Sequence, residues 1–235
     1  MIGYEIRHCG GYAALSPEMS EPRLVLASRS PRRYELLRLL GLPFEVMAAD
    51  VRETPRAGER PAELVSRLSR AKADGAQLVD RNDALLIGCD TVVVLKDDIL
   101  GKPRGANEAG AILRRLRGRS HFVYSAVTLL DPVGRAATEL AETRLTMRAY
   151  SDAEIWAYVA SGDPLDKAGG YAIQHEGFHP VARVEGCYAS VMGLPLCHLA
   201  RGLRNWDVEP ATDVPTACQA HTGHRCAVYR EIMTL

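Results

Sequence analysis

The spacing of apolar residues predicts alternating strands and helices in the first part of the chain. Short apolar runs typical of buried strands lie at residues 23–28, 44–51 and 84–95. Segments with apolar residues at helical spacing lie between them, at residues 31–40 and 60–79. The first of these helices is expected to end at Gly41 and Pro43, because glycine terminates helices and proline cannot continue them. The pattern predicts the order strand, helix, strand, helix, strand.

The second part of the chain continues this alternation and adds an antiparallel pair. The expected elements are a loop and helix at 101–118, two antiparallel strands at 121–131 and 139–150, and a helix at 151–162. Ser151 and Glu154 form the capping-box pattern that opens this last helix. Residues 163–204 are interpreted as loop-rich up to a short helix at their end. The alternation favours an α/β fold, and the antiparallel pair favours a mixed sheet bent around a cleft.

Composition and charge narrow the classes of protein. The chain has 235 residues, of which 47% are hydrophobic, and it carries no net formal charge. A chain of this length can bury an ordinary core, and its neutrality gives no support to nucleic-acid or membrane binding. The apolar runs are shorter than a membrane span, and the N-terminus lacks the pattern of a secretory leader. Its six cysteines are too few for a disulfide scaffold, so we predict a cytoplasmic protein.

The same pattern divides the chain into three parts. Residues 1–22 show no sustained periodicity and are interpreted as an N-terminal extension. Residues 23–205 are expected to form the folded domain, and residues 206–235 a C-terminal tail.

The tail carries a cluster of residue types that bind zinc. Its members are Cys218, His221, His224 and Cys226. Their spacing matches no zinc-finger pattern, so we expect a tail without metal and keep a zinc site as the alternative.

Two adjacent arginines stand where a helix is expected to begin. Ser30 is a good N-cap and Pro31 a good first helical residue. Arg32 and Arg33 then occupy the first turn, where each costs from a few tenths to about 1 kcal/mol unless an anion is nearby. The guanidinium groups, free N–H groups and the hydroxyl of Ser28 suit a triphosphate. The alternative is that both side chains point to water or pair with surface acids.

A carboxylate and two lysines could handle the chemistry of a phosphoanhydride. Asp90 stands in a long apolar run at a predicted carboxyl-terminal strand edge, where α/β sheets bind ligands. It could coordinate Mg²⁺ or take a proton from an attacking water, or it could merely cap the following turn. Lys72 and Lys102 could hold phosphate oxygens, although a lysine late in a helix, like Lys72, also stabilises the helix dipole.

The segment DKAGGYAIQ, residues 166–174, brings further polar groups next to paired glycines. Lys167 adds a positive charge, and the glycines allow a ligand to approach the backbone closely. Gln174 offers a donor and an acceptor on one amide, which can read the imide edge of uracil or thymine. The alternative is an amide exposed to water.

Four motifs occur in order along the chain. They are LASRSPRRYELL (26–37), GCDTVV followed by GKP (88–93 and 101–103), DKAGGYAIQ (166–174) and VEGCYASVMGLPL (184–196). Together they resemble the Maf family of nucleoside triphosphate pyrophosphatases, from about Arg23 to Arg204. The resemblance implies an elongated Maf-like (ITPase-like) α/β fold, with a central mixed sheet and two lobes around an active-site cleft. It also implies a homodimer.

The resemblance implies roles for individual residues. It makes Asp90 the catalytic residue, and Glu53 and Asp90 the ligands of a divalent cation, Mg²⁺ or Mn²⁺. From the residues alone, Glu53 is not distinguished from Asp50 or Glu59. The substrate-binding residues are expected to be Ser28, Arg32, Arg33, Lys72, Thr91, Lys102, Lys167 and Gln174. Among these, Arg33, Thr91 and Gln174 match positions associated with the choice of base.

The implied reaction is attack of water on the α-phosphate, which releases a nucleoside monophosphate and pyrophosphate. KAGGYAIQ resembles the KAGxYxIQ pattern of the branch that acts on dTTP and UTP, so these and modified pyrimidine nucleotides are the expected substrates. His175 and Cys187 depart from the family pattern, where glycine and serine are usual. The alternatives are a 7-methyl-GTP pyrophosphatase, a phosphatase that releases orthophosphate, and a nucleotide-binding regulator of septum formation.

Overall fold

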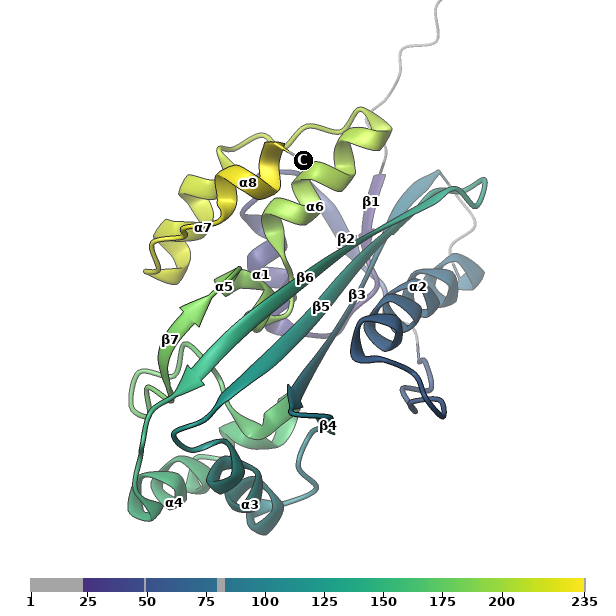
Figure 1. Cartoon of the computed structure of the whole chain (residues 1–235). Coiled ribbons are helices and arrows are strands. Elements are labelled where there is room, and N and C mark those ends of the chain that lie inside the picture. The colour runs from purple at the N-terminus through teal and green to yellow at the C-terminus, as the bar shows by residue number, and fades with distance from the viewer. Residues whose placement is uncertain (1–22, 49, 80–82, 235) are drawn as a thin grey trace, which may run out of the picture.

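A mixed sheet of seven strands runs through the molecule (Figure 1). The computed structural model describes residues 23–48, 50–79 and 83–234, so the predicted N-terminal extension lies outside the described residues. The strands are β1 (Arg23–Leu26), β2 (Phe44–Val46), β3 (Ala84–Leu95), β4 (Asp98–Leu100), β5 (Ser120–Leu130), β6 (Ala136–Met147) and β7 (Val181–Glu185). Their order is β2, β1, β3, β5, β6, β7, with β4 paired to β3. β1 is parallel to β2 and β3, and the other pairs are antiparallel, which confirms the predicted mixed α/β fold.

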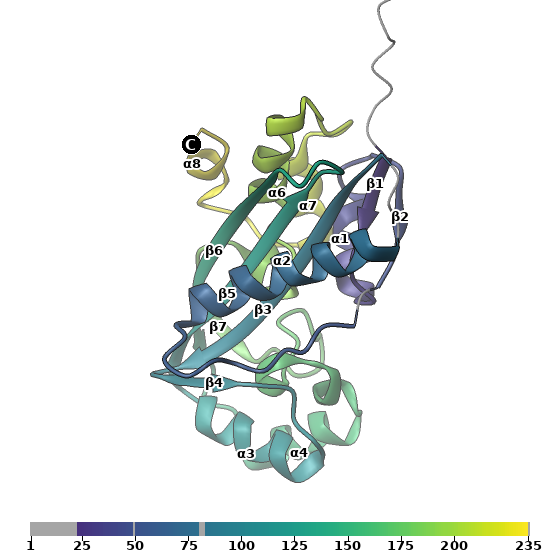
Figure 2. The ribbon, with the colours of Figure 1, turned by 90° about the vertical axis from the view of Figure 1, so that its right-hand side faces the viewer.

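Helices cover both faces of the sheet and build a second lobe at one end of it (Figure 2). The helices are α1 (Pro31–Arg38), α2 (Pro61–Val79), α3 (Ala106–Leu116), α4 (Asp152–Ala160), α5 (Tyr188–Met192), α6 (Leu196–Leu203), α7 (Val214–Thr222) and α8 (Tyr229–Thr234), with 3₁₀ helices η1 (Asp163–Asp166), η2 (Ala168–Gly170) and η3 (Arg204–Trp206). α2 lies on one face, and α1, α5 and α6 lie on the other. α3 and α4 pack together with η1 and η2 beyond the end of the sheet, so the predicted arrangement of two lobes is confirmed.

The short length of β1 opens an edge of β3. β1 pairs with β3 only up to Ile87, and β4 pairs with β3 only from Val93 onward. β5 occupies the other side of β3 throughout this region. Between Ile87 and Val93, β3 therefore has no partner on the open side among the described strands. Asp90 and Thr91 stand on this free edge, where side chains from both faces of the sheet can reach one cleft.

Some elements differ from the sequence predictions. β2 ends at Val46, although its apolar run continues to residue 51. β4 occupies a segment for which the apolar pattern predicted no strand, and β7 occupies one interpreted as loop. Both are short, and β7 has no fully buried residue, so neither shows a clear apolar alternation. The helix starts were predicted correctly, since Ser30 caps α1 and Ser151 forms a capping box with Glu154 on α4.

The described part of the tail folds against the sheet domain. α7 and α8 both contact α6, and Cys218 and Ile232 are buried in the main core. The guanidinium of Arg201 on α6 donates to the carbonyl oxygen of Ile232 over 2.9 Å. The hydroxyl of Thr212 donates to the carbonyl oxygen of Leu39 at the end of α1. The sequence pattern missed this packing because each short helix buries only one or two side chains, and the boundary at residue 205 stays a prediction.

Three of the four zinc-ligand types in the tail line one small cavity, and the fourth does not. Cys218, His224 and Cys226 line a cavity of about 10 Å³, while His221 is exposed. His224 instead stacks on Tyr188 of α5, with ring centroids 4.8 Å apart. Within the described residues, no three His, Cys, Asp or Glu side chains are placed to hold a metal ion.

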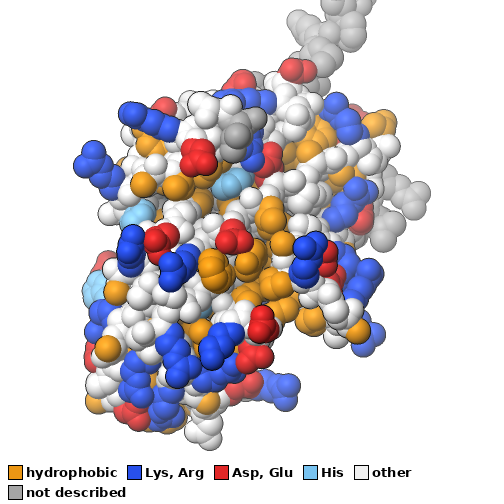
Figure 3. Space-filling model, viewed as in Figure 1, with side chains coloured by type: hydrophobic (Ala, Val, Ile, Leu, Met, Phe, Trp, Pro, Cys, Tyr) orange, Lys and Arg blue, Asp and Glu red, His pale blue; other side chains and the backbone are white. Residues whose placement is uncertain are grey.

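Charged groups on the surface are largely interspersed (Figure 3). Lys and Arg side chains gather over the lower part of the face shown, where α3 and α4 lie, with acidic side chains among them. Asp152 pairs with Arg114 and Arg117, and Asp98 pairs with Arg115. No helix in the described ranges has the length and apolar character needed to cross a bilayer.

Candidate active site

A cleft of about 480 Å³ separates the two lobes. Three of its walls come from the start of α1, the free edge of β3 and residues 50–53, which lie in the connection that leads into α2. The others come from the loop at Lys102 and from segments 166–174 and 191–193. All the site residues predicted from the sequence line this cleft: Ser28, Arg32, Arg33, Glu53, Lys72, Asp90, Thr91, Lys102, Lys167 and Gln174. The structure therefore brings them together, while their roles in binding and catalysis stay predictions.

The two arginines of α1 point into this cleft and make different contacts. The guanidinium of Arg32 pairs with Asp166 of η1, in the second lobe, at 3.3 Å. Arg33 donates from Nε to the carbonyl oxygen of Gly193 (2.9 Å) and from Nη1 to Ser28 Oγ (3.2 Å). A third bond runs from Nη2 to Thr91 Oγ1 (3.4 Å), so every described partner of Arg33 is neutral. The charge of Arg33 therefore remains available to an anion.

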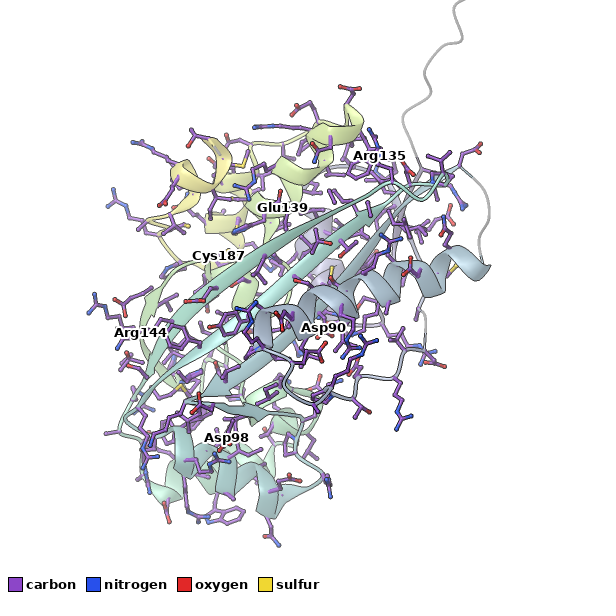
Figure 4. All side chains as sticks on the ribbon, turned by 45° about the vertical axis from the view of Figure 1, so that its right-hand side comes forward. Asp90, Asp98, Arg135, Glu139, Arg144 and Cys187 are labelled. Carbon is purple, nitrogen blue, oxygen red and sulfur yellow. The ribbon has the colours of Figure 1, made fainter. Side chains whose placement is uncertain are left out.

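A lysine between two carboxylates forms the centre of the cleft. Lys72 Nζ lies 2.5 Å from Asp90 Oδ1 and 2.6 Å from Glu53 Oε1. Asp90 is only 5% exposed and lies on β3 beside α2 (Figure 4). Lys72 lies on α2, and Glu53 lies in the segment that precedes α2.

Burial and the nearby cations act differently on the two carboxylates. Burial raises the pKa of Asp90, and the charge and hydrogen bond of Lys72 only partly oppose this. Burial also opposes ionisation of Glu53, but the hydrogen bond and charge of Lys72 outweigh it and its pKa is lowered. The charges of Lys102 and Arg33, which line the same cleft, also contribute to that lowering. A carboxylate with a raised pKa is a better proton acceptor than an ordinary one.

The donor set fits a divalent cation. Glu53 and Asp90 contact the same ammonium nitrogen, so both carboxylates face one point of the cleft, where they already hold a cation. Mg²⁺ prefers carboxylate oxygens supplemented by waters and phosphate oxygens, and two protein ligands are enough for it. In the described residues no third acidic, His or Cys side chain joins them, so the remaining positions would fall to substrate and water.

Lys167 forms hydrogen bonds within the protein that the sequence did not indicate. Its ammonium donates to the carbonyl oxygen of Asp163 (2.6 Å), to Asp163 Oδ1 (2.8 Å) and to Asp166 Oδ1 (2.6 Å). These acceptors engage all three of its protons. Asp166 in turn holds Arg32, so Lys167 orients Arg32 through Asp166, and its direct contact with a substrate stays a prediction.

Sequence reasoning missed the residues behind the cleft wall. Ser125 on β5 hydrogen-bonds Thr91 at 2.8 Å, and Tyr171, which lines the cleft, hydrogen-bonds the buried His121 at 2.7 Å. Ser125 and His121 are both internal positions of the largely apolar strand β5. The only signal for Ser125 was a hydroxyl within a run of residues that otherwise pack in a core.

Comparisons with known proteins place the chain in a family. The family model described as Maf-like protein matches residues 23–206. A dTTP/UTP pyrophosphatase of Pelotomaculum thermopropionicum is 45% identical over 184 residues, which cover 78% of this chain and 96% of that protein. The dTTP/UTP pyrophosphatase of Methylococcus capsulatus is 47% identical, covering 78% of this chain and 90% of its own length. That of Myxococcus xanthus is 51% identical over 175 residues, 74% of this chain and 87% of its own. With its four motifs gathered in one cleft, the chain belongs to the Maf family.

Proposed function

We propose that this protein is a nucleoside triphosphate pyrophosphatase that converts dTTP and UTP to the monophosphates and pyrophosphate. The observation that carries the proposal is the cluster of Glu53, Lys72 and Asp90 in the same cleft as Arg33, whose described hydrogen-bond partners are all neutral. The relatives' names, dTTP/UTP pyrophosphatase, support the activity and the choice of nucleotide.

The chemistry follows from the groups in the cleft. Asp90 orients a water molecule and accepts its proton as the water oxygen attacks the α-phosphorus, and the bond to the β-phosphate oxygen breaks. Arg33, Lys72 and Lys102 hold phosphate oxygens and offset the charge that develops on them. A divalent cation bound by Glu53 and Asp90 would supply further charge neutralisation.

The base is expected to lie near segments 172–174 and 191–193. These segments supply apolar surface from Ile173 and Met192 next to the amide of Gln174. An apolar wall with one amide and one hydroxyl, that of Thr91, suits a planar base that is recognised by its polar edge.

Product analysis tests the activity. The purified protein is incubated with Mg²⁺ or Mn²⁺ and each of the common nucleoside triphosphates, and pyrophosphate and orthophosphate are measured separately. We expect pyrophosphate, released fastest from dTTP and UTP. Orthophosphate as the first product would indicate a phosphatase, and tight binding without turnover would indicate a nucleotide-binding regulator. A preference for 7-methyl-GTP would place the protein in the other branch.

The expected setting of the enzyme rests on the sequence. The small number of cysteines supports a reducing compartment such as the cytoplasm, and the resemblance to the family supports a homodimer. Sedimentation equilibrium at micromolar concentration tests the dimer, and a molecular weight of about 25.7 kDa, that of one chain, would contradict it.

A further inference from the structure

Buried hydroxyl groups connect α5 to the wall of the cleft. Thr91 on β3 and Ser125 on β5 are cross-strand partners, and their hydroxyl oxygens lie 2.8 Å apart. Ser125 is completely buried, and its Oγ donates to the carbonyl oxygen of Ser190 on α5 over 2.6 Å. Of these three hydrogen-bonded residues, Thr91 is the one that lines the cleft.

The partners of Ser125 determine which way each proton points. A serine hydroxyl has one proton, and a carbonyl oxygen can only accept, so the proton of Ser125 belongs to the bond with Ser190. The bond between Thr91 and Ser125 must then use the proton of Thr91. Arg33 Nη2, which can only donate, faces Thr91 Oγ1 at 3.4 Å. The Thr91 hydroxyl therefore has no proton left for the cleft and presents only a lone pair to it.

The carbonyl group that fixes this arrangement is itself held firmly. Ser190 Oγ donates to the carbonyl oxygen of Cys187 over 2.7 Å and lies 2.9 Å from Thr143 Oγ1 on β6. The backbone N–H of Cys187 donates to the same Thr143 oxygen over 3.0 Å. Thr143 and Ser190 are both completely buried. The first turn of α5 is thus tied to β6, so buried hydrogen bonds hold the acceptor of the Ser125 proton in place.

We propose that Ser125 is a specificity-determining residue that acts through Thr91 by making its hydroxyl a pure hydrogen-bond acceptor, and that this selects a base with a ring N–H. The proposal rests on the proposed function. Uracil and thymine carry a proton on the imide nitrogen between their two carbonyl groups, whereas cytosine carries a lone pair there. A fixed acceptor forms a hydrogen bond with the first kind of ring and repels the second.

Thr91 without Ser125 would not discriminate in this way. A free hydroxyl rotates and can either donate or accept, so it would serve both kinds of ring nitrogen. The discrimination therefore depends on a residue that never touches the nucleotide.

The test compares UTP and CTP in the Ser125→Ala variant. Removal of Oγ frees the proton of Thr91, which can then turn to the ring nitrogen of cytosine. We expect kcat/KM to rise about fivefold for CTP, the size of effect that one hydrogen bond supplies, and to fall by no more than about twofold for UTP, because the freed hydroxyl can still accept from the ring N–H. A gain for CTP is the diagnostic result, because a general loss of structure lowers both rates together.

Thr128→Ala is the matched control. Thr128 is also on β5 and completely buried, and its hydroxyl bonds Ser69 at 2.7 Å and Thr138 at 2.8 Å, away from the cleft-lining residues. It is expected to lower the thermal midpoint without changing the ratio of UTP to CTP.

Two further variants make the result decisive. Ser125→Cys fills the same space with a weaker donor and acceptor, and it is expected to shift the ratio in the same direction by a smaller factor. In a Thr91→Val background, Ser125→Ala should change the ratio no further, because the two residues act as one unit. An unchanged ratio in either folded Ser125 variant, or an additive effect in the Thr91→Val background, overturns the proposal. A wild-type protein that releases no pyrophosphate, or that prefers CTP, overturns the proposed function as well.

Discussion

A Cβ atom added to Gly88 on β3 would lie 2.1 Å from the carbonyl oxygen of Ser69 on α2, so the helix touches the strand backbone at this point. The same atom would lie 2.8 Å from the backbone nitrogen of Ala73. Both contacts are with backbone atoms, which cannot yield unless the whole helix moves. Lys72 stands between them on α2 and contacts Asp90. The spacing of α2 and β3 therefore sets the geometry of the lysine–carboxylate cluster.

Gly88→Ala is expected to push α2 away from β3 and separate Lys72 from Asp90. We expect a loss of about 3 kcal/mol in the free energy of unfolding, as for other overpacked cores, and a larger loss of turnover than of nucleotide binding. Chemical denaturation and steady-state rates measure the two effects. Gly105→Ala is the control, because its Cβ would meet no atom within 4 Å. A Gly88→Ala protein with the stability and rate of the wild type would contradict this account.

The sequence predicts those features that local residues determine. The start of α1 follows from Ser30 and Pro31, and the start of α4 from Ser151 and Glu154, because caps depend on residues within one turn. The β3 strand was visible because it is buried along nearly its whole length and so reads as one apolar run.

The sequence does not show what depends on distant contacts. The free edge of β3 exists because β1 stops at Leu26, and the need for glycine at Gly88 exists because α2 crosses there. Lys167 and Ser125 belong to networks whose other members are set by the fold. Asp90 could be found as an acidic residue within an apolar run, although it lies inside β3 and not at the carboxyl-terminal strand edge that the sequence predicted. Glu53 could be selected from neighbouring acids only by resemblance to the family.

Asp90→Asn is expected to leave the fold intact and remove most of the turnover. An amide can neither accept the proton of the attacking water nor offer a full charge to a cation, and loss of a general base costs roughly 10²- to 10⁴-fold in rate. Nucleotide binding should survive, because Arg33 and Lys102 remain. Pyrophosphate release and the thermal midpoint are measured on the same preparation. A folded variant that releases pyrophosphate at nearly the normal rate would exclude the role assigned to Asp90.

Gln174→Ala is expected to narrow the preference for dTTP and UTP over CTP and the purine nucleotides. Its amide lines the cleft and can both donate to and accept from the edge of a base. Loss of one such bond should cost about 0.5 to 1.5 kcal/mol in transition-state stabilisation for the preferred substrates. Rates for the full set of nucleotides, compared as kcat/KM, measure the change. If the order and spacing of the rates stay the same, Gln174 has no part in base selection.

The stability of the protein is expected to fall as the pH drops below about 6.5. Burial lowers the pKa of both His121 and His198 to about 4, and their Nδ1 atoms have no described hydrogen-bond partner. In the unfolded chain both would bind a proton near pH 6.5, whereas the folded protein binds it only near pH 4. The stabilisation is therefore complete above pH 6.5 and is lost between these values, on the order of 2 kcal/mol for each histidine.

Unfolding midpoints between pH 7.5 and 4.5 test this expectation. His198 lies near Arg201, which disfavours its protonation, and near Glu139, which favours it, but burial has the largest effect. His198→Leu should flatten the pH dependence, while substitution of the exposed His221 by Asn should leave it unchanged. An equal slope in the wild type and the His198→Leu variant would show that His198 does not contribute.

Truncation after Arg204 is expected to lower stability while leaving the chemistry largely intact. The removed segment buries Val208, Val214, Cys218 and Ile232 in the main core, and loss of these contacts should cost several kcal/mol at about 1.5 to 3 kcal/mol for each large apolar side chain. For a chain of this size such a loss corresponds to a fall of roughly 10 °C in the thermal midpoint. Turnover measured well below that midpoint should stay within a few-fold of the wild type, because none of the described residues after Gly193 lines the cleft. If the thermal midpoint does not change, α7 and α8 do not stabilise the core. If turnover collapses in a truncated protein that is still folded, the tail shapes the cleft through its contacts with α5 or with the end of α1.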